Sequence, residues 1–297
     1  MKEFPSLIDD ADLPSGLNVQ NADADPKCQV MIAPVLHFKL VRIVSRILHS
    51  LYGIHAPTEA RRISLGEELN DELHEWRRQI PPFLDASQVE PKFLLPMFER
   101  QSNMLSQAYA HAVILVNRGW VMSDLKDSHL APGEDMRPDV SACLSAALSI
   151  LDTINKMFQA NRIFPAYWFT QYQGFCAIVM IYTYTIRAWS EDNEFCLRHF
   201  RAAERCQSQI ASIAQEGSLA HRYFVIMEEF RSEVRGHIKI DPDQWTGTVL
   251  TPQSPNKIPQ CQTLTDEELS MVMNGFLDPG IPLVDFDFES CMGSGDP

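Results

Sequence analysis

The sequence lacks the paired cysteines from which a disulfide framework is built. Its seven cysteines are an odd number, they are widely scattered, and no two of them form a Cys-x-x-Cys pair. This spacing favours buried free thiols in a reducing compartment over a set of disulfide bridges.

Sequence signatures of common catalytic sites are also missing. The chain contains no Gly-x-Ser-x-Gly nucleophile motif, no phosphate-binding P-loop and no dinucleotide-binding glycine pattern. Residues 1–14 are acidic and short of a hydrophobic run, so they do not form a secretory signal. We therefore expect a protein that is not an enzyme and that uses no cofactor.

An excess of basic residues is the third absence. The net charge is −14, and the surplus acid lies in the flanks, since residues 27–240 carry 23 basic and 23 acidic side chains. Acidic flanks repel phosphate, and no basic stripe offers the counterion release that drives binding to nucleic acid. Direct DNA binding by this chain is not expected.

No stretch alternates between apolar and polar residues as a half-buried strand does, which predicts an all-α fold. Its centre is predicted at residues 164–189, because no charged side chain occurs between Arg162 and Arg187. A helix that is apolar on all sides must be buried, either in a large helical core or in a bilayer. Gln171 and Gln173 interrupt the run of about 20 apolar residues that a bilayer requires. We therefore expect a buried central helix and no membrane span.

Amphipathic helices are predicted on both sides of this segment, giving an irregular multi-helix bundle around the central apolar helix. Apolar residues recur at helical spacing in six further stretches: 35–52, 64–80, 93–122, 138–158, 195–214 and 219–240. Ser64 and Glu67 have the spacing of a capping box, which predicts a helix start there. The pattern divides the chain into an acidic connector (1–29), a helical domain (30–240) and a disordered acidic tail (241–297).

Five stretches have the order and spacing of a known helical region. They are LNDELHEWRRQIPP (69–82), MLSQAYAHAVILVNRGWV (104–121), CLSAALSILDTI (143–154), FPAYWFTQYQGFCAIVMIYTYTI (164–186) and CLRHFRAAERCQSQIASIA (196–214). Together with the acidic opening SLIDDADLPSGL (6–17), they resemble the fungal-specific transcription factor domain. This domain is the middle homology region of the fungal binuclear zinc-cluster regulators.

The chain departs from this family at two places. Asn117-Arg118-Gly119 stands where the family has His-Arg-Pro. The six-cysteine zinc cluster, its basic linker, the coiled coil and the helices before the acidic connector do not occur, so the resemblance implies an N-terminally truncated regulator. Helix 35–52 and one face of the central helix would then lack packing partners. Because each large apolar side chain left in water forfeits roughly 1.5–3 kcal/mol, we expect an exposed apolar surface, a dimer or poor solubility.

The resemblance also implies a function. It indicates the regulatory helical region of a fungal transcription factor, located in the nucleus and controlling metabolic or secondary-metabolite genes. Its partners would be the transcription machinery or a dimer partner. A small-molecule effector would be sought in aromatic-lined space near Trp168, Tyr172, Tyr182 and Tyr184. A standalone protein that binds a full-length regulator is an alternative.

A further alternative is an all-α, Mg²⁺-dependent prenyl-diphosphate enzyme. Asp9, Asp10 and Asp12 could hold Mg²⁺ for the ionisation of a diphosphate. They lie in an acidic connector bounded by prolines, and no later helix carries a second metal motif. We interpret them as a solvated run of charge.

Two histidines, His199 and His111, are candidate site residues. Cys196, His199 and Cys206 share one predicted helix, but Cys206 follows Cys196 by nearly three turns, which is too far for one tetrahedral zinc site. We expect two core cysteines and a solvent-facing histidine. His111 is expected to be a hydrogen-bonded core or interface residue, because it lies within an apolar stripe.

The acidic tail contains the one candidate functional segment outside the helical domain. Apolar side chains there are interleaved with acids, a composition typical of activation segments that dock their aromatics in a partner's groove. The alternative is an acidic end without function. The residues of this candidate activation segment are Leu269, Val272, Met273, Phe276, Phe286 and Phe288.

Overall fold

The structure is a computed structural model, and it describes residues 26–55, 57–85, 96–123, 136–164, 166–189, 194–214 and 218–238. Over these ranges the chain forms α-helices and one 3-10 helix and no strand, which confirms the all-α prediction. The elements are α1 (Pro26–Leu51), α2 (Glu59–Arg78), η3 (Pro82–Leu84), α3 (Pro96–Ser123), α4 (Pro138–Gln159), α5 (Trp168–Ala188), α6 (Glu194–Ile213) and α7 (Leu219–Ile238).

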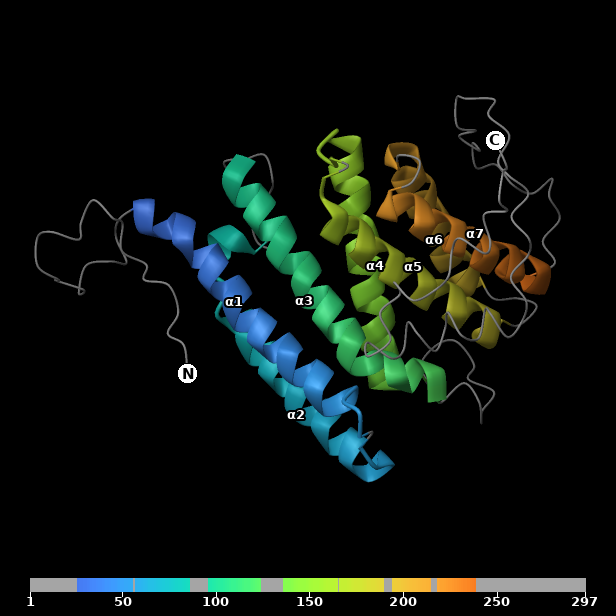
Figure 1. The fold of residues 1–297 in the computed structure, drawn as a ribbon, viewed down its shortest axis with the longest axis horizontal. Helices are drawn as coiled ribbons and strands as arrows, with labels where there is room; N and C mark the ends of the chain where they lie inside the picture. The colour runs from blue at the N-terminus through green and yellow to red at the C-terminus, as the bar shows by residue number, and fades with distance from the viewer. Residues whose placement is uncertain are drawn as a thin grey trace, which may run out of the picture.

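The helices form two groups that meet at α3 (Figure 1). Helices α1 and α2 form a hairpin that packs against α3, and α4 packs on the other side of α3. Helix α5 lies against α4, α6 and α7, and it also contacts α3. The main contacts of the α1–α2 hairpin with the rest of the bundle therefore run through α3.

Helix α5 has the central place that its sequence predicts. All side chains from Gln173 to Thr185 are buried. Gly174 lets α5 approach α4 and α6 closely. A Cβ at this position would lie 2.7 Å from the Cδ1 of Ile154 on α4 and 2.8 Å from the Cδ1 of Ile210 on α6. The expectation that one face of this helix lacks partners is wrong, because α3, α4, α6 and α7 surround it. On α1, Phe38 and Val41 are each 48% exposed.

Helix α3 is a second buried helix, which the sequence pattern did not single out. Every side chain from Ala110 to Arg118 is buried. The stripe predicted for this stretch covered only one side of the helix. The other side is buried as well because α3 separates the α1–α2 hairpin from α4 and α5.

Three helix starts differ by four or more residues from their predicted positions. Helix α1 begins at Pro26 and runs through Pro34, before the predicted start at residue 35. Helix α2 begins at Glu59, where the Thr58 hydroxyl accepts a hydrogen bond from the Arg61 N–H at 3.4 Å. The capping box predicted at Ser64 is therefore wrong, since Ser64 lies inside the helix. Helix α5 begins at Trp168, one turn after the predicted residue 164.

Candidate functional site

The segment Asn117-Arg118-Gly119, which differs from the resembled family's His-Arg-Pro at its first and third residues, lies at a buried junction of helices. Asn117 on α3 is fully buried, and its Nδ2 donates to the Val113 carbonyl at 2.9 Å. The side-chain amides of Asn117 and Asn70, on α2, exchange two hydrogen bonds of 3.0 and 3.1 Å. This amide pair fixes the position of α2 along α3.

Arg118 extends the junction to the end of α1. Its Nε donates to the Tyr52 hydroxyl at 3.0 Å, and its guanidinium lies over the Tyr52 ring, 4.2 Å from the centroid. The Tyr52 hydroxyl in turn donates to the Leu115 carbonyl at 2.6 Å. At Gly119 the Arg62 side chain approaches closely, because a Cβ would lie 3.3 Å from its Nη1. The whole segment holds the α1–α2 hairpin against α3.

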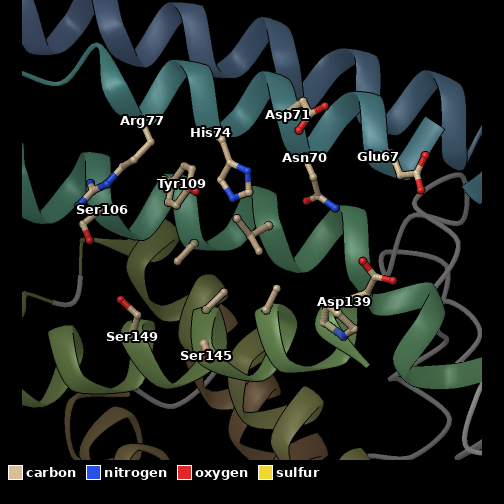
Figure 2. Close-up of a pocket in the computed structure, with 15 residues that line it drawn as sticks. Glu67, Asn70, Asp71, His74, Arg77, Ser106, Tyr109, Asp139, Ser145 and Ser149 are labelled. Atoms are coloured by element: carbon tan, nitrogen blue, oxygen red, sulfur yellow. The ribbon is translucent and has the colours of Figure 1, made fainter. Parts of the chain in front are cut away.

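Beside this junction, an open groove runs between α2 and α4 with α3 as its floor (Figure 2). It has a volume of about 720 Å³. The floor is formed by Tyr109, Ala110 and Val113, and the α4 wall is formed mainly by small side chains. These small side chains are Ala142, Ser145, Ala146 and Ser149, which have the i, i+3, i+4, i+7 spacing of one helix face.

The two ends of the groove differ in charge. Glu67 on α2 and Asp139 on α4 lie toward one end, and Arg77 lies toward the other (Figure 2). Asp71 is a further lining residue on α2. Arg77 donates to the Asp85 carboxylate at 2.7 Å and lies over the Tyr109 ring, so its charge is already matched.

Sequence reasoning missed this groove. Its α2 and α4 walls consist largely of exposed polar and small residues, which carry no burial pattern. The detectable signal was the run of small side chains on the outer face of α4, where a solvent-exposed helix usually carries long charged residues.

The aromatic residues proposed to line an effector site do not come together. Trp168 is 59% exposed at the start of α5, and Tyr172 is half-buried one turn later. Tyr182 and Tyr184 are buried near the other end of α5, where the Tyr182 hydroxyl donates to Gln207 at 2.6 Å. The predicted aromatic-lined space is therefore not formed by these four side chains. They lie on a helix whose rise of about 1.5 Å per residue separates its two ends.

His111 is buried on α3, as predicted, but its environment differs from the prediction. Its ring lies edge-on to Phe169 and Tyr172, at centroid distances of 6.2 and 5.5 Å. Its Nε2 has no hydrogen-bond partner among the described residues. Burial, with a smaller contribution from the Arg118 charge, lowers the pKa of His111 to about 4. The side chain is therefore neutral in the folded protein at physiological pH.

The three residues considered as zinc ligands, Cys196, His199 and Cys206, lie in the core. Cys196 and Cys206 are buried, as predicted. The prediction of a solvent-facing His199 is wrong: its side chain is buried, its Nδ1 is 2.5 Å from the Phe195 carbonyl oxygen, and burial lowers its pKa. Helix α6 packs against α4, α5 and α7, so less of its surface is exposed than the pattern of a single helix indicates. Within the described ranges, no three His, Cys, Asp or Glu side chains group as metal ligands would.

Several predicted residues lie outside the described part of the chain. These are Asp9, Asp10 and Asp12 and the six residues of the candidate activation segment, Leu269, Val272, Met273, Phe276, Phe286 and Phe288. In the ranges that the structure does describe, no helix is both long enough and apolar enough to cross a membrane.

Comparison with known proteins identifies two distant relatives among yeast regulators. Over 166 residues the chain is 22% identical to an uncharacterized transcriptional regulatory protein of Schizosaccharomyces pombe, which covers 56% of this chain and 20% of that protein. Over 282 residues it is 21% identical to a protein of Saccharomyces cerevisiae provisionally named as a transcriptional regulatory protein, which covers 88% of this chain and 37% of that protein. No family model and no solved structure matches the chain. The chain thus spans between a fifth and two fifths of the length of these relatives, and the likeness is consistent with a fungal transcription factor.

Proposed function

We propose that this chain is the regulatory helical region of a fungal transcription regulator. The observation that carries the proposal is the alignment with a yeast transcriptional regulatory protein along 88% of the chain. A likeness of that extent includes most of the helical bundle and does not depend on a single motif.

The chemistry of the chain agrees with a role that depends on protein contacts. Residues 27–240 are balanced in charge, and the flanks are acidic, so the chain offers no basic surface for DNA. DNA contact would then come from outside these residues, and the site of action would be the nucleus. The resemblance to zinc-cluster regulators points to metabolic or secondary-metabolite genes as targets.

Within this role, residues 262–291 would act as the activation segment. Phe276, Phe286 and Phe288 lie among acidic residues that keep them solvated until a partner's groove takes them. The negative charge would favour basic surfaces of the transcription machinery.

A reporter assay tests the proposal. The full chain is fused to a DNA-binding domain that does not activate by itself, and reporter output is measured in yeast at matched protein levels. We expect output several-fold above that of the DNA-binding domain alone. Changing Phe276, Phe286 and Phe288 to Ala should remove most of it.

The matched control changes Gln260, Gln262 and Asn274 to Ala in the same tail and should leave output unchanged. Baseline output from the unmodified fusion would contradict the proposal. Equal output from the phenylalanine variant and its control would contradict the assignment of the activation segment.

A further inference from the structure

We propose that the groove between α2 and α4 is a docking site for a basic amphipathic helix of a protein partner. The proposal uses only the geometry and charge of the groove. It does not require that the chain regulates transcription, so the two proposals can fail independently.

The shape of the groove fits a rod of about three helical turns. Its α2 wall runs from Glu67 to Arg77, and its α4 wall runs from Pro138 to Ser149. At about 1.5 Å per residue, each wall is roughly 15 Å long. A helix laid along the groove would insert one face and leave the other in water, which is how amphipathic helices bind apolar grooves.

The lining of the groove favours close approach of another helix. The floor residues Ala110 and Val113 are buried and apolar, while Ala142 and Ser145 on the α4 wall are exposed and small. The distance between packed helices depends on the side chains at their contact, and small ones permit the shortest distances. Leucine side chains of a visiting helix would therefore reach the floor.

The charge of the groove selects a basic occupant. Glu67 and Asp71 form no ion pair among the described residues, and as like charges at i and i+4 they repel each other on α2. Asp139 adds a third carboxylate, whose Oδ2 forms an ion pair with the Arg137 Nη2 at 3.2 Å. Lysine or arginine on the rim of a bound helix would relieve this repulsion.

The same charges argue against the chain's own tail as the occupant. Residues 241–297 carry one lysine against ten acidic residues. Placing that segment beside Glu67 and Asp71 would add further repulsion. The partner is therefore expected to be a different molecule with basic residues flanking an apolar stripe.

Binding of a model helix to the full chain tests the proposal. The probe is a fluorescein-labelled 14-residue peptide with Leu at i, i+3, i+4 and i+7 spacing and Lys elsewhere, and the readout is fluorescence anisotropy at low and high salt. We expect saturable binding that weakens with salt, because the contacts at the rim are exposed ion pairs. A peptide with Glu in place of Lys should not bind.

Paired variants separate the groove from the general attraction of an acidic protein. The double change Glu67→Gln and Asp71→Asn should weaken binding about tenfold, the sum expected for two exposed ion pairs. The matched control, Glu68→Gln with Glu75→Gln, removes the same charge from the outer side of α2, where these residues pair with Arg61 and Arg78. It should change binding by less than about twofold.

A steric pair completes the test. Ala142→Trp fills the groove without changing charge and should abolish binding, whereas Ser141→Trp on the neighbouring, non-lining position should not. Circular dichroism confirms that each variant is folded. Equal binding by the two charge variants, equal binding by the two tryptophan variants, or equal binding of a proline-interrupted peptide of the same composition would each overturn the proposal.

Discussion

Gln101 supplies the hydrogen bond that Pro34 removes. Pro34 lies inside α1 and has no backbone N–H, so the Val30 carbonyl one turn earlier lacks its usual helical donor. The Gln101 Nε2, on α3, donates to that carbonyl at 3.0 Å. This bond between two helices gives the Val30 carbonyl a donor and ties the first turns of α1 to α3.

The first prediction concerns the coupling of these two residues. Gln101→Ala should lower the free energy of unfolding by about 1–2 kcal/mol, because it leaves the Val30 carbonyl without a donor. In a Pro34→Ala background the restored N–H takes that carbonyl, so the same change should have less than half the effect. Urea unfolding of the four proteins measures the coupling, and additive effects would show that the two residues act independently.

The second prediction concerns the amide pair of Asn70 and Asn117. Asn117→Ala should destabilise the protein by about 2–3 kcal/mol, since it removes the partner of the Asn70 amide and leaves a cavity at a fully buried site, although the Val113 carbonyl keeps its helical backbone donor. Asn70→Ala should have a smaller effect, about 1 kcal/mol, because Asn70 is only half-buried. Thermal and urea unfolding check the order of the two effects, and the reverse order would contradict this account of the junction.

The third prediction concerns acid stability and His111. Its folded-state pKa of about 4 lies below the unfolded value, so the unfolded chain binds the proton first as the pH falls. The contribution of His111 to the free energy of unfolding is therefore constant above pH 6.5 and is lost progressively between pH 6.5 and 4. The loss from this residue should reach about 2–3 kcal/mol at pH 4.5.

Replacing His111 with Met should remove this contribution, so that the variant loses less stability than the wild type between pH 7.5 and 4.5. His49→Met is the control, because it makes the same substitution at an exposed position on α1. Parallel profiles for wild type and His111→Met would refute the assignment.

The fourth prediction concerns the buried thiols. Burial raises the pKa of Cys143, Cys176, Cys196 and Cys206 to about 12, so very little thiolate exists at pH 8. These four residues should resist alkylation by iodoacetamide in the native protein and react fully in urea. Peptide mass spectrometry assigns each modified position, and rapid native labelling of Cys176 would contradict the burial of α5.

The sequence predicted the bundle well where one face of a helix meets the core. On α4, six residues are predicted to face inward. Five of them are buried (Cys143, Leu144, Ala147, Leu151 and Ile154), and the sixth, Phe158, is half-buried. The pattern is informative there because α4 keeps an exposed face, so apolar and polar residues separate by helical period.

The sequence failed to predict features that depend on contacts between segments far apart in the chain. The start of α1 depends on Gln101, which lies 71 residues from the carbonyl that it satisfies. The burial of His199 on α6 depends on how this helix packs against its neighbours α4, α5 and α7. The groove depends on the spacing between α2 and α4, which is set by how each helix packs on α3 and by no local feature of either.

The double role of α3 gives the molecule a mechanical consequence. With 28 residues, α3 is a rod of roughly 40 Å that carries the α1–α2 hairpin on one side and α4 on the other. Because α2 is fastened to this rod by the Asn70–Asn117 pair, any tilt of the hairpin changes the width of the groove and strains that pair at the same time. The hairpin and α4 therefore flank the same helix, and the Asn70–Asn117 hydrogen bonds between α2 and α3 resist a change in the distance between them.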